Sequence, residues 1–103
     1  MRRIQNLLGM AQRANRIASG NLAVEQALKN GTAKYLLIAE DAEEASRKAY
    51  TEMAERYRVP CKTALEREAL GACLGKPCRA AAAILDDGFR KALERLLEGT
   101  EAR

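Results

Sequence analysis

Histidine is absent from this 103-residue sequence, and cysteine occurs only three times, at Cys61, Cys73 and Cys78. Without histidine the chain cannot build a zinc site of mixed cysteine and histidine ligands. An odd number of cysteines leaves one thiol unpaired in any disulfide scheme, so we expect reduced thiols. The spacing of Cys73 and Cys78 also fits a redox or metal-binding pair, but a cysteine more often serves as a small hydrophobic residue. We therefore predict neither a metal site nor a cofactor.

Long apolar runs are missing from the start of the chain. The polar side chains of Gln5, Asn6, Gln12 and Arg13 interrupt any stretch long enough for a signal sequence or a membrane span. We therefore predict a cytoplasmic protein. Hydrophobic residues make up 48% of the sequence and charged residues 31%, and no linker is evident. A chain of this length closes one hydrophobic core, so we expect a single domain over residues 1–103.

The positive charge of the chain is concentrated in two segments. The formal net charge is +4, yet residues 1–34 hold six basic residues against one acidic residue, a net charge of +5. Residues 60–79 hold four basic residues against two acidic residues, a net charge of +2. If these segments meet in the folded protein, they form a patch suited to a polyanion; if they do not, the charges are an ordinary solvated surface.

The periodicity of the first third of the chain predicts two helices. Apolar residues at three- and four-residue spacing predict an amphipathic helix over residues 3–16, followed by a short extended link at residues 17–19. We expect Gly20 and Asn21 to form a turn, with Asn21 as the N-cap of a second helix. That helix should end at Gly31, where glycine allows a left-handed C-terminal cap.

An uninterrupted apolar run over residues 35–39 predicts a strand that is covered on both faces. The acidic residues that follow match a capping box, in which Asp41 accepts from a first-turn amide and Glu44 reaches back to the amide of Asp41. We therefore expect a third helix from Ala42. Its core-facing stripe should consist of Ala42, Ala45, Ala49, Met53 and Tyr57.

The region after this helix holds a break and a second capping signal. Pro60 should end the third helix, and residues 61–63 should form a short strand. Thr63 and Glu66 match a capping box for a short helix that reaches Gly71.

The last quarter of the chain predicts a loop, a strand and a final helix. Residues 75–79 should form the loop and the alanine-rich residues 80–85 the strand. The stripe of the final helix should consist of Phe89, Ala92, Leu93, Leu96 and Leu97. Helices that alternate with short apolar strands predict an α/β fold, a three-layer α/β/α sandwich on a small mixed sheet of about four strands.

Acidic residues lie where the predicted strands end, at Glu40, Asp41, Asp86 and Asp87. Enzymes with an α/β fold often place catalytic groups there, so a small enzyme using Glu40 or Asp86 is one alternative. Helix capping is the simpler interpretation, because the sequence has no histidine, no glycine-rich phosphate loop and no recognisable nucleophile elbow. We therefore assign no catalytic residue.

Several short blocks, spread over nearly the whole chain, resemble those of one known family. They are Leu-Leu-Gly-Met-Ala-Gln-Arg-Ala-Asn-Arg at residues 7–16, Ser19-Gly20, Gly-Thr-Ala-Lys at 31–34, Glu40-Asp41, Val59-Pro60, Leu70-Gly71 and Asp-Asp-Gly-Phe at 86–89. The sequence resembles the kink-turn-binding ribosomal protein superfamily, that of the archaeal large-subunit L-seven-Ae protein, and within it the bacterial YlxQ-type branch. The blocks between residues 31 and 41 are the most specific.

This resemblance implies an α/β/α sandwich that binds RNA bent at a three-nucleotide bulge beside sheared G·A pairs. In such proteins the start of the second helix enters the RNA groove and a nearby loop packs on the extruded bases. The resemblance implies a non-enzymatic, RNA-binding protein of the ribosome or the translation machinery, and we expect a monomer. The physical basis is general, since helix N-termini attract phosphate and folded RNA is recognised through its shape and splayed bases.

Transferred to this sequence, the resemblance implies two binding segments and three further phosphate contacts. Family positions that are typically Asn, Glu and Lys fall on Leu22, Ala23 and Gln26, which weakens direct base recognition. The groove-facing residues are Gly20, Asn21, Leu22, Ala23, Gln26 and Lys29. The bulge-facing loop residues are Lys76, Pro77, Cys78 and Arg79. The further phosphate contacts are Arg13, Arg16 and Lys34.

Leu22 leaves a second interpretation open, because the apolar stripe of the second helix turns Leu22 toward the other side. An apolar residue in an exposed first turn is either a minor contact or part of an interaction surface. The alternative function is therefore a protein-interaction module on the same fold, with Leu22 and Ala23 in the contact patch. Salt-insensitive association with a protein, without retention on RNA, distinguishes this alternative.

Overall fold

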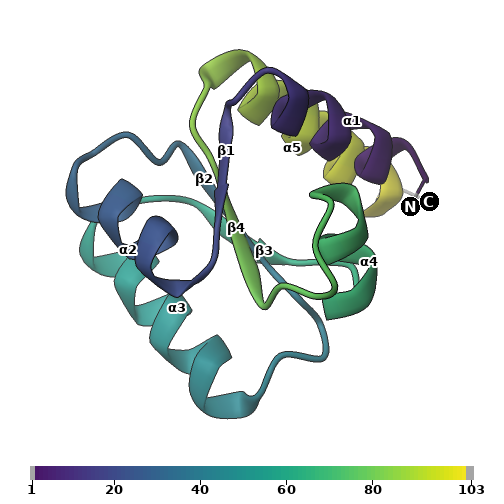
Figure 1. Ribbon diagram of the computed structural model, residues 1–103. Coiled ribbons are helices and arrows are strands. Elements are labelled where there is room, and N and C mark those ends of the chain that lie inside the picture. The colour runs from purple at the N-terminus through teal and green to yellow at the C-terminus, as the bar shows by residue number, and fades with distance from the viewer. Residues whose placement is uncertain (1, 102–103) are drawn as a thin grey trace.

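The computed structural model describes residues 2–101 of the chain (Figure 1). Over these residues, helices alternate with short strands. In chain order the elements are α1 (Arg2–Arg13), β1 (Ile17–Ser19), α2 (Asn21–Lys29), β2 (Tyr35–Ile38), α3 (Glu44–Arg56), β3 (Cys61–Thr63), α4 (Arg67–Cys73), β4 (Ala81–Ile84) and α5 (Asp87–Glu101).

The strands of this described region form one mixed sheet in the order β1-β4-β2-β3. β4 lies inside the sheet and runs antiparallel to both neighbours, so that Ala83 is opposite Ala18 on one side and Leu36 on the other. β2 and β3 are parallel, with Leu37 opposite Lys62. The predicted small mixed sheet is therefore confirmed.

Helices cover the sheet on both sides (Figure 1). α1, α4 and α5 lie on one face, and α2 and α3 lie on the other. β2 and β4 are buried along their whole length, because helices shield both of their faces. This arrangement is the predicted three-layer α/β/α sandwich.

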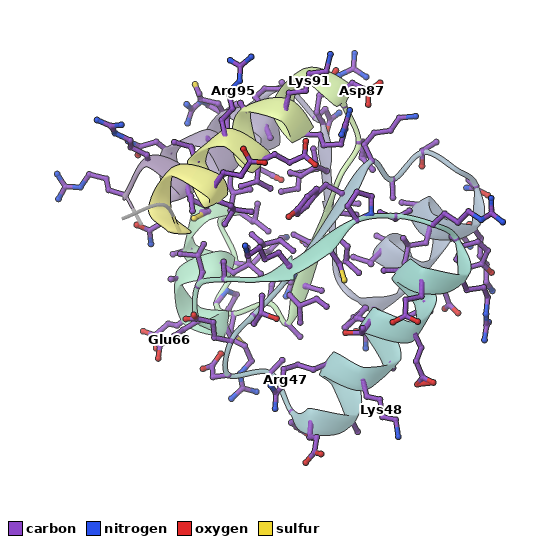
Figure 2. The ribbon with its side chains drawn as sticks, turned by 180° about the vertical axis from the view of Figure 1, so that it is seen from behind. Arg47, Lys48, Glu66, Asp87, Lys91 and Arg95 are labelled. Carbon is purple, nitrogen blue, oxygen red and sulfur yellow. The ribbon has the colours of Figure 1, made fainter. Side chains whose placement is uncertain are left out.

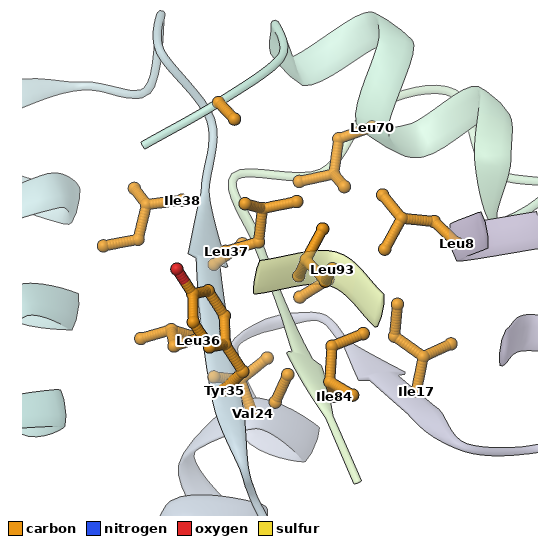
Figure 3. Packing of buried hydrophobic residues seen from close by; sticks show 14 of the residues in the cluster. Leu8, Ile17, Val24, Tyr35, Leu36, Leu37, Ile38, Leu70, Ile84 and Leu93 are labelled. Atoms are coloured by element: carbon orange, nitrogen blue, oxygen red, sulfur yellow. The ribbon is translucent and has the colours of Figure 1, made fainter. Parts of the chain in front are cut away.

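The core forms where aliphatic side chains of the helices meet β2 and β4 (Figure 3). Leu36 and Leu37 of β2 are fully buried, as are Leu8 of α1 and Val24 of α2. The small side chains of residues 81–83 in β4 let helices from both layers approach the sheet closely, and close packing of this kind maximises dispersion contacts.

The N-terminal region differs from the prediction in two places. α1 ends at Arg13 rather than Arg16, because the chain turns at Asn15, whose φ of 62° is left-handed and incompatible with a continuing helix. Residues 17–19 are not a link but the edge strand β1, which pairs along its whole length with β4. A three-residue strand is too short to show a periodic pattern of its own.

The two predicted capping boxes are wrong. α3 begins at Glu44 rather than Ala42, α4 begins at Arg67, and neither helix is capped by the side chain of its own N-cap residue. Asp41 Oδ1 instead accepts a hydrogen bond from the backbone N–H of Arg67 at 2.7 Å, so the pair Thr63 and Glu66 does not supply the cap. Because β2 and β3 are parallel, the segments that follow them lie at the same edge of the sheet. A carboxylate after β2 therefore reaches the helix that follows β3.

The predicted core stripe of α3 is also wrong in its centre. Ala45 and Ala49 are exposed, whereas Tyr50 and Ala54 are buried. The aromatic ring of Tyr50 buries far more apolar area than the methyl group of Ala49, so the helix face that carries Tyr50 turns inward.

Several predicted element ends are confirmed. Gly31 has a φ of 77° and follows α2, as expected of a left-handed cap. Asp86 Oδ2 accepts a hydrogen bond from the backbone N–H of Phe89 at 3.0 Å, which confirms the capping interpretation for this acid. The loop at residues 75–79, the strand that follows it and the final helix also lie where they were predicted.

Candidate functional site

The edge of the sheet where β1 ends is the place where the two predicted binding segments meet. Antiparallel pairing puts Ser19, the last residue of β1, opposite Ala82 near the start of β4. The chain therefore enters α2 through Gly20 beside the point where the loop from α4 approaches β4 through Arg79. Segments that are far apart in the sequence become neighbours at this edge.

Arg79 joins these two segments. Its Nε donates a hydrogen bond to Oγ of Ser19 at 3.2 Å, across 60 residues of sequence. Its Nη1 donates to the carbonyl oxygen of Cys78 at 2.9 Å, and its backbone N–H donates to the carbonyl oxygen of Arg67 at 3.0 Å. The guanidinium is thereby held between the start of α2 and the loop that precedes β4.

The loop at residues 76–79 lies directly on α4. The backbone N–H of Lys76 donates to the carbonyl oxygen of Gly71 at 2.9 Å. A Cβ atom at Gly71 would lie 2.5 Å from Cα of Cys78, so only glycine allows the loop to approach this closely. Lys76, Pro77 and Cys78 remain exposed, and they form the outer surface of the loop.

The start of α2 presents polar backbone and an apolar side chain to solvent. Gly20 is the N-cap, with a φ of 92°, and no side chain caps the helix, so Asn21 is the first helical residue rather than the predicted cap. The first turn holds no acidic residue, so the positive end of the helix dipole is not neutralised there. Leu22 is 71% exposed, and Ala23 and Gln26 are exposed beside it.

Asn21 is held by α3. The hydroxyl of Tyr50, a buried residue, donates a hydrogen bond to Oδ1 of Asn21. Burial raises the pKa of Tyr50, and the charge of Glu25 raises it further, so the hydroxyl stays protonated and able to donate. Because its oxygen is engaged, Asn21 retains its amide N–H₂ group for another partner.

Two of the three predicted phosphate contacts, Arg16 and Lys34, lie away from this edge. Arg16 accepts a hydrogen bond from the backbone N–H of Leu85, and Lys34 donates one to the carbonyl oxygen of Ile84, so both lie at the far end of β4, roughly 10 Å away. Arg13 closes α1. At this edge the positive side chains are therefore Lys76 and Arg79 of the loop.

Lys29 is also distant from the edge where α2 begins. It lies in the last turn of α2 and forms an exposed ion pair with Glu25 at 3.5 Å. The other predicted groove-facing residues, Gly20, Asn21, Leu22, Ala23 and Gln26, lie at the start and along the outer side of α2.

Sequence reasoning missed three residues that support this site, which are Ser19, Tyr50 and Gly71. Ser19 and Gly71 are both part of blocks that carry the family resemblance, so a signal for them existed. Tyr50 offered no such signal, because its contact with Asn21 crosses 29 residues of sequence and depends on how α3 packs on α2.

Within the part of the chain that the structure describes, no group of three or more histidine, cysteine, aspartate or glutamate residues is arranged to hold a metal ion. No helix of that part is long and apolar enough to cross a membrane. The three cysteines are free, and Cys73 donates its thiol hydrogen to the carbonyl oxygen of Ala69 at 3.2 Å.

A separate shallow hollow of about 410 Å³ lies between α3 and β3. Its lining mixes both signs of charge, and Arg47 and Lys48 lie on this side of the molecule (Figure 2). The lining residues are Glu44, Arg47, Lys48, Thr51, Glu52 and Thr63. None of the predicted binding residues lies in it.

Comparison with known proteins identifies the family. The model of the ribosomal protein L7Ae/L30e/S12e/Gadd45 family matches residues 2–94. The chain belongs to this family. The L7Ae/L30e/S12e/Gadd45 model therefore spans every element from α1 to the middle of α5, including both segments of the candidate site.

Two relatives place the chain within the bacterial branch that the sequence resembles. The RNA-binding protein YlxQ of Bacillus subtilis (strain 168) is 38% identical over 92 residues, which cover 89% of this chain and 92% of that protein. The RNA-binding protein YlxQ of Enterococcus faecium is 33% identical over 94 residues, which cover 91% of this chain and 90% of that protein. The predicted resemblance is confirmed.

Two solved structures share the fold. A protein of unknown function from Bacillus halodurans C superposes with a TM-score of 0.87 and 29% identity, covering 92% of this chain and 96% of its own. The 15.5kD RNA binding protein of Giardia lamblia superposes with a TM-score of 0.76 and 21% identity, covering 95% of this chain and 84% of its own.

Proposed function

We propose that this protein binds structured RNA of the kink-turn type, without catalysis, as a cytoplasmic monomer of the ribosome or translation machinery. One observation carries the proposal: the hydrogen bond from Arg79 to Ser19 joins the start of α2 and the loop at residues 76–79 into one surface. The names of the YlxQ relatives and of the Giardia lamblia protein support RNA as the ligand.

The chemistry of this surface suits a bent RNA. The uncapped start of α2 offers backbone N–H groups and positive potential to phosphate, Arg79 adds a cation beside it, and Lys76 adds a second on the same loop. Exposed Pro77 and Cys78 provide an apolar surface on which an unstacked base can pack.

Recognition of the kink should depend on shape more than on base edges. Leu22 and Ala23 carry no hydrogen-bonding group in their side chains, so they contribute van der Waals contact in the groove. Asn21, with its free amide N–H₂ group, and Gln26 are the side chains of α2 that can donate to a base or a phosphate.

Filter binding of a kink-turn RNA to variants tests this proposal. Lys76→Ala combined with Arg79→Ala should weaken binding by about tenfold or more and reduce the salt slope by about 2, because two phosphate contacts are lost. Lys48→Ala combined with Arg56→Ala removes the same charge from exposed positions of α3, and it should leave binding near the wild-type value. Equal losses in both variants, or no loss in the first, would contradict the assignment.

The exposure of Leu22 favours one alternative, a protein-interaction module on the same fold. In that case Leu22→Ser should abolish association with a protein partner, the association should persist at high salt, and RNA should not be retained. RNA retention that is lost on Lys76→Ala with Arg79→Ala decides against this alternative.

A further inference from the structure

α1 carries a cationic outer face. Its sequence holds Arg2, Arg3 and Arg13 and no acidic residue, and all three arginines are exposed, while the opposite side of the helix is buried. Among the described residues, no carboxylate forms an ion pair with any of these arginines. Arg2 and Arg13 are eleven residues apart, which spans about 16 Å along a helix.

α5 extends this face. The backbone N–H of Leu85, just before α5, donates to the carbonyl oxygen of Arg16, just after α1, at 2.9 Å, so the two helices run side by side in opposite directions (Figure 1). Lys91 and Arg95 are four residues apart, and therefore share one side of α5. Both are exposed, and Figure 2 shows them at the outer rim of the molecule.

Acidic residues of α5 lie beside these cations. Arg90 forms ion pairs with Asp87 at 3.3 Å and with Glu94 at 3.2 Å, so its single positive charge is shared between two carboxylates. Glu98 is also exposed and lies three residues after Arg95, so the two side chains are neighbours on the helix surface. Lys91 and Arg95 form no ion pair with a described residue.

The resulting α1–α5 basic surface, made of Arg2, Arg3, Arg13, Lys91 and Arg95, lies in the helix layer opposite α2. We propose that it is a second RNA-binding surface, which holds the phosphate backbone of a duplex arm that continues beyond the kinked segment. Charge complementarity supports this occupant, because a row of unpaired cations along a helix matches the row of phosphates along a duplex. This inference rests on the proposed function, since the polyanion is taken to be RNA.

Two RNAs that share one kink-turn test the inference, one with minimal arms and one with an arm lengthened by about two helical turns. The test variant is Lys91→Gln with Arg95→Gln, and the matched control is Lys48→Gln with Arg56→Gln on α3. On the long RNA, the test variant should bind on the order of tenfold more weakly than wild type, with a salt slope lower by about 2. On the short RNA, it should bind like wild type. Circular dichroism melting confirms that both variants are folded.

The other outcomes distinguish failure of the second RNA-binding surface from failure of the proposed function. If the test variant binds both RNAs as wild type does, the second surface is wrong and the proposed function stands. If it weakens binding to both RNAs equally, or if the control variant loses as much, these cations do not form a separate surface. If the wild-type protein binds neither RNA, the proposed function fails and the inference fails with it.

Discussion

The guanidinium of Arg79 donates a hydrogen bond to the hydroxyl of Ser19 at 3.2 Å, and this contact links the loop before β4 to the start of α2. The two residues are 60 positions apart. Their meeting follows from the antiparallel pairing of β1 with β4, which brings the end of one strand to the start of the other. The contact positions the charge of Arg79 beside the exposed first turn of the helix.

Two variants separate the positioning of the Arg79 side chain from its charge. Ser19→Ala removes the hydrogen-bond acceptor but keeps the cation, so we expect RNA binding to weaken by about 0.5–1.5 kcal/mol with an unchanged salt slope. Arg79→Ala removes both, and should also lower the salt slope by about 1. Titrations at several salt concentrations measure both quantities. A slope that falls equally in the two variants would refute the positioning role of Ser19.

Gly71 should be essential for the loop that carries Lys76 and Cys78. In Gly71→Ala the new methyl group would lie 2.5 Å from Cα of Cys78, so the loop must move or the helix must shift. Overpacking of this kind costs about 1–3 kcal/mol of stability. We also expect weaker RNA binding, because the displaced loop no longer presents Lys76 correctly.

Gly9→Ala is the matched control for this variant. At Gly9 the nearest atoms to a new Cβ are Arg13 Nη1 at 3.7 Å and the carbonyl oxygen of Cys73 at 3.9 Å, which are ordinary contacts. Alanine inside a helix is favoured over glycine by about 0.5–1 kcal/mol, so this variant should be slightly more stable than wild type. Thermal melting compares the two, and a Gly71→Ala protein as stable as Gly9→Ala would contradict the close approach of the loop.

Cys78 should react with iodoacetamide faster than the other two cysteines. Cys78 is exposed, whereas Cys61 and Cys73 are half-buried, and burial raises the pKa of both thiols. The thiolate is the reactive form, so a raised pKa slows alkylation at pH 8. Peptide mass spectrometry after timed alkylation identifies the residue that reacts.

Bound RNA should protect Cys78. Saturating kink-turn RNA covers the loop in the proposed complex, so alkylation of Cys78 should slow several-fold, whereas the Lys76→Ala and Arg79→Ala double variant should show little protection. An unchanged rate in the presence of bound RNA places the interface elsewhere on the molecule.

Stability should fall at alkaline pH. Burial raises the pKa of Tyr35, Tyr50, Cys61 and Cys73 above their ordinary values, which are 10.0 for tyrosine and 9.0 for cysteine. Above those values the unfolded chain loses protons that the folded chain retains, so the free energy of unfolding decreases as pH rises. Below pH 8 this contribution to stability is fully present.

Urea denaturation between pH 7.5 and pH 10.5 measures this dependence. Tyr50→Phe removes one of the titrating groups, so its unfolding free energy should change less with pH than that of wild type. The Tyr50→Phe protein should also be less stable at neutral pH, because the hydrogen bond from Tyr50 to Asn21 is lost. A pH dependence that is identical in the two proteins would show that Tyr50 titrates as it does in the unfolded chain.

The interior of the fold was predictable, because buried strands leave a simple signal. The runs that became β2 and β4 are apolar without interruption, and the structure covers both faces of each strand. β1 was missed because it is a three-residue edge strand that ends in Ser19. Its strand geometry comes from pairing with β4 and not from its own composition.

Contacts between residues far apart in the sequence could not be predicted from local sequence patterns. Asp41 has the spacing of a capping residue for α3, yet its carboxylate accepts a hydrogen bond from the backbone N–H of Arg67, 26 residues away. The two residues are adjacent because β2 and β3 are parallel. Tyr50 and Ala49 both fit a helical stripe, but only Tyr50 is buried, because α3 packs against α2 through the face that carries Tyr50. Of the predicted binding residues, those next to Gly20 and Arg79 lie close together in the fold. Arg16 and Lys34 lie at the other end of β4, one strand length away from them.

The central claim is that the surface around Ser19 and Arg79 recognises kinked RNA. A gel-shift titration of the wild-type protein tests it most directly, using a kink-turn RNA and a variant in which Watson–Crick pairs replace the G·A pairs, at two salt concentrations. We expect tighter binding to the kinked RNA at both salt concentrations. Equal binding to the two RNAs, with affinity that depends only on salt, would contradict kink recognition, and the absence of binding to either would contradict RNA as the ligand.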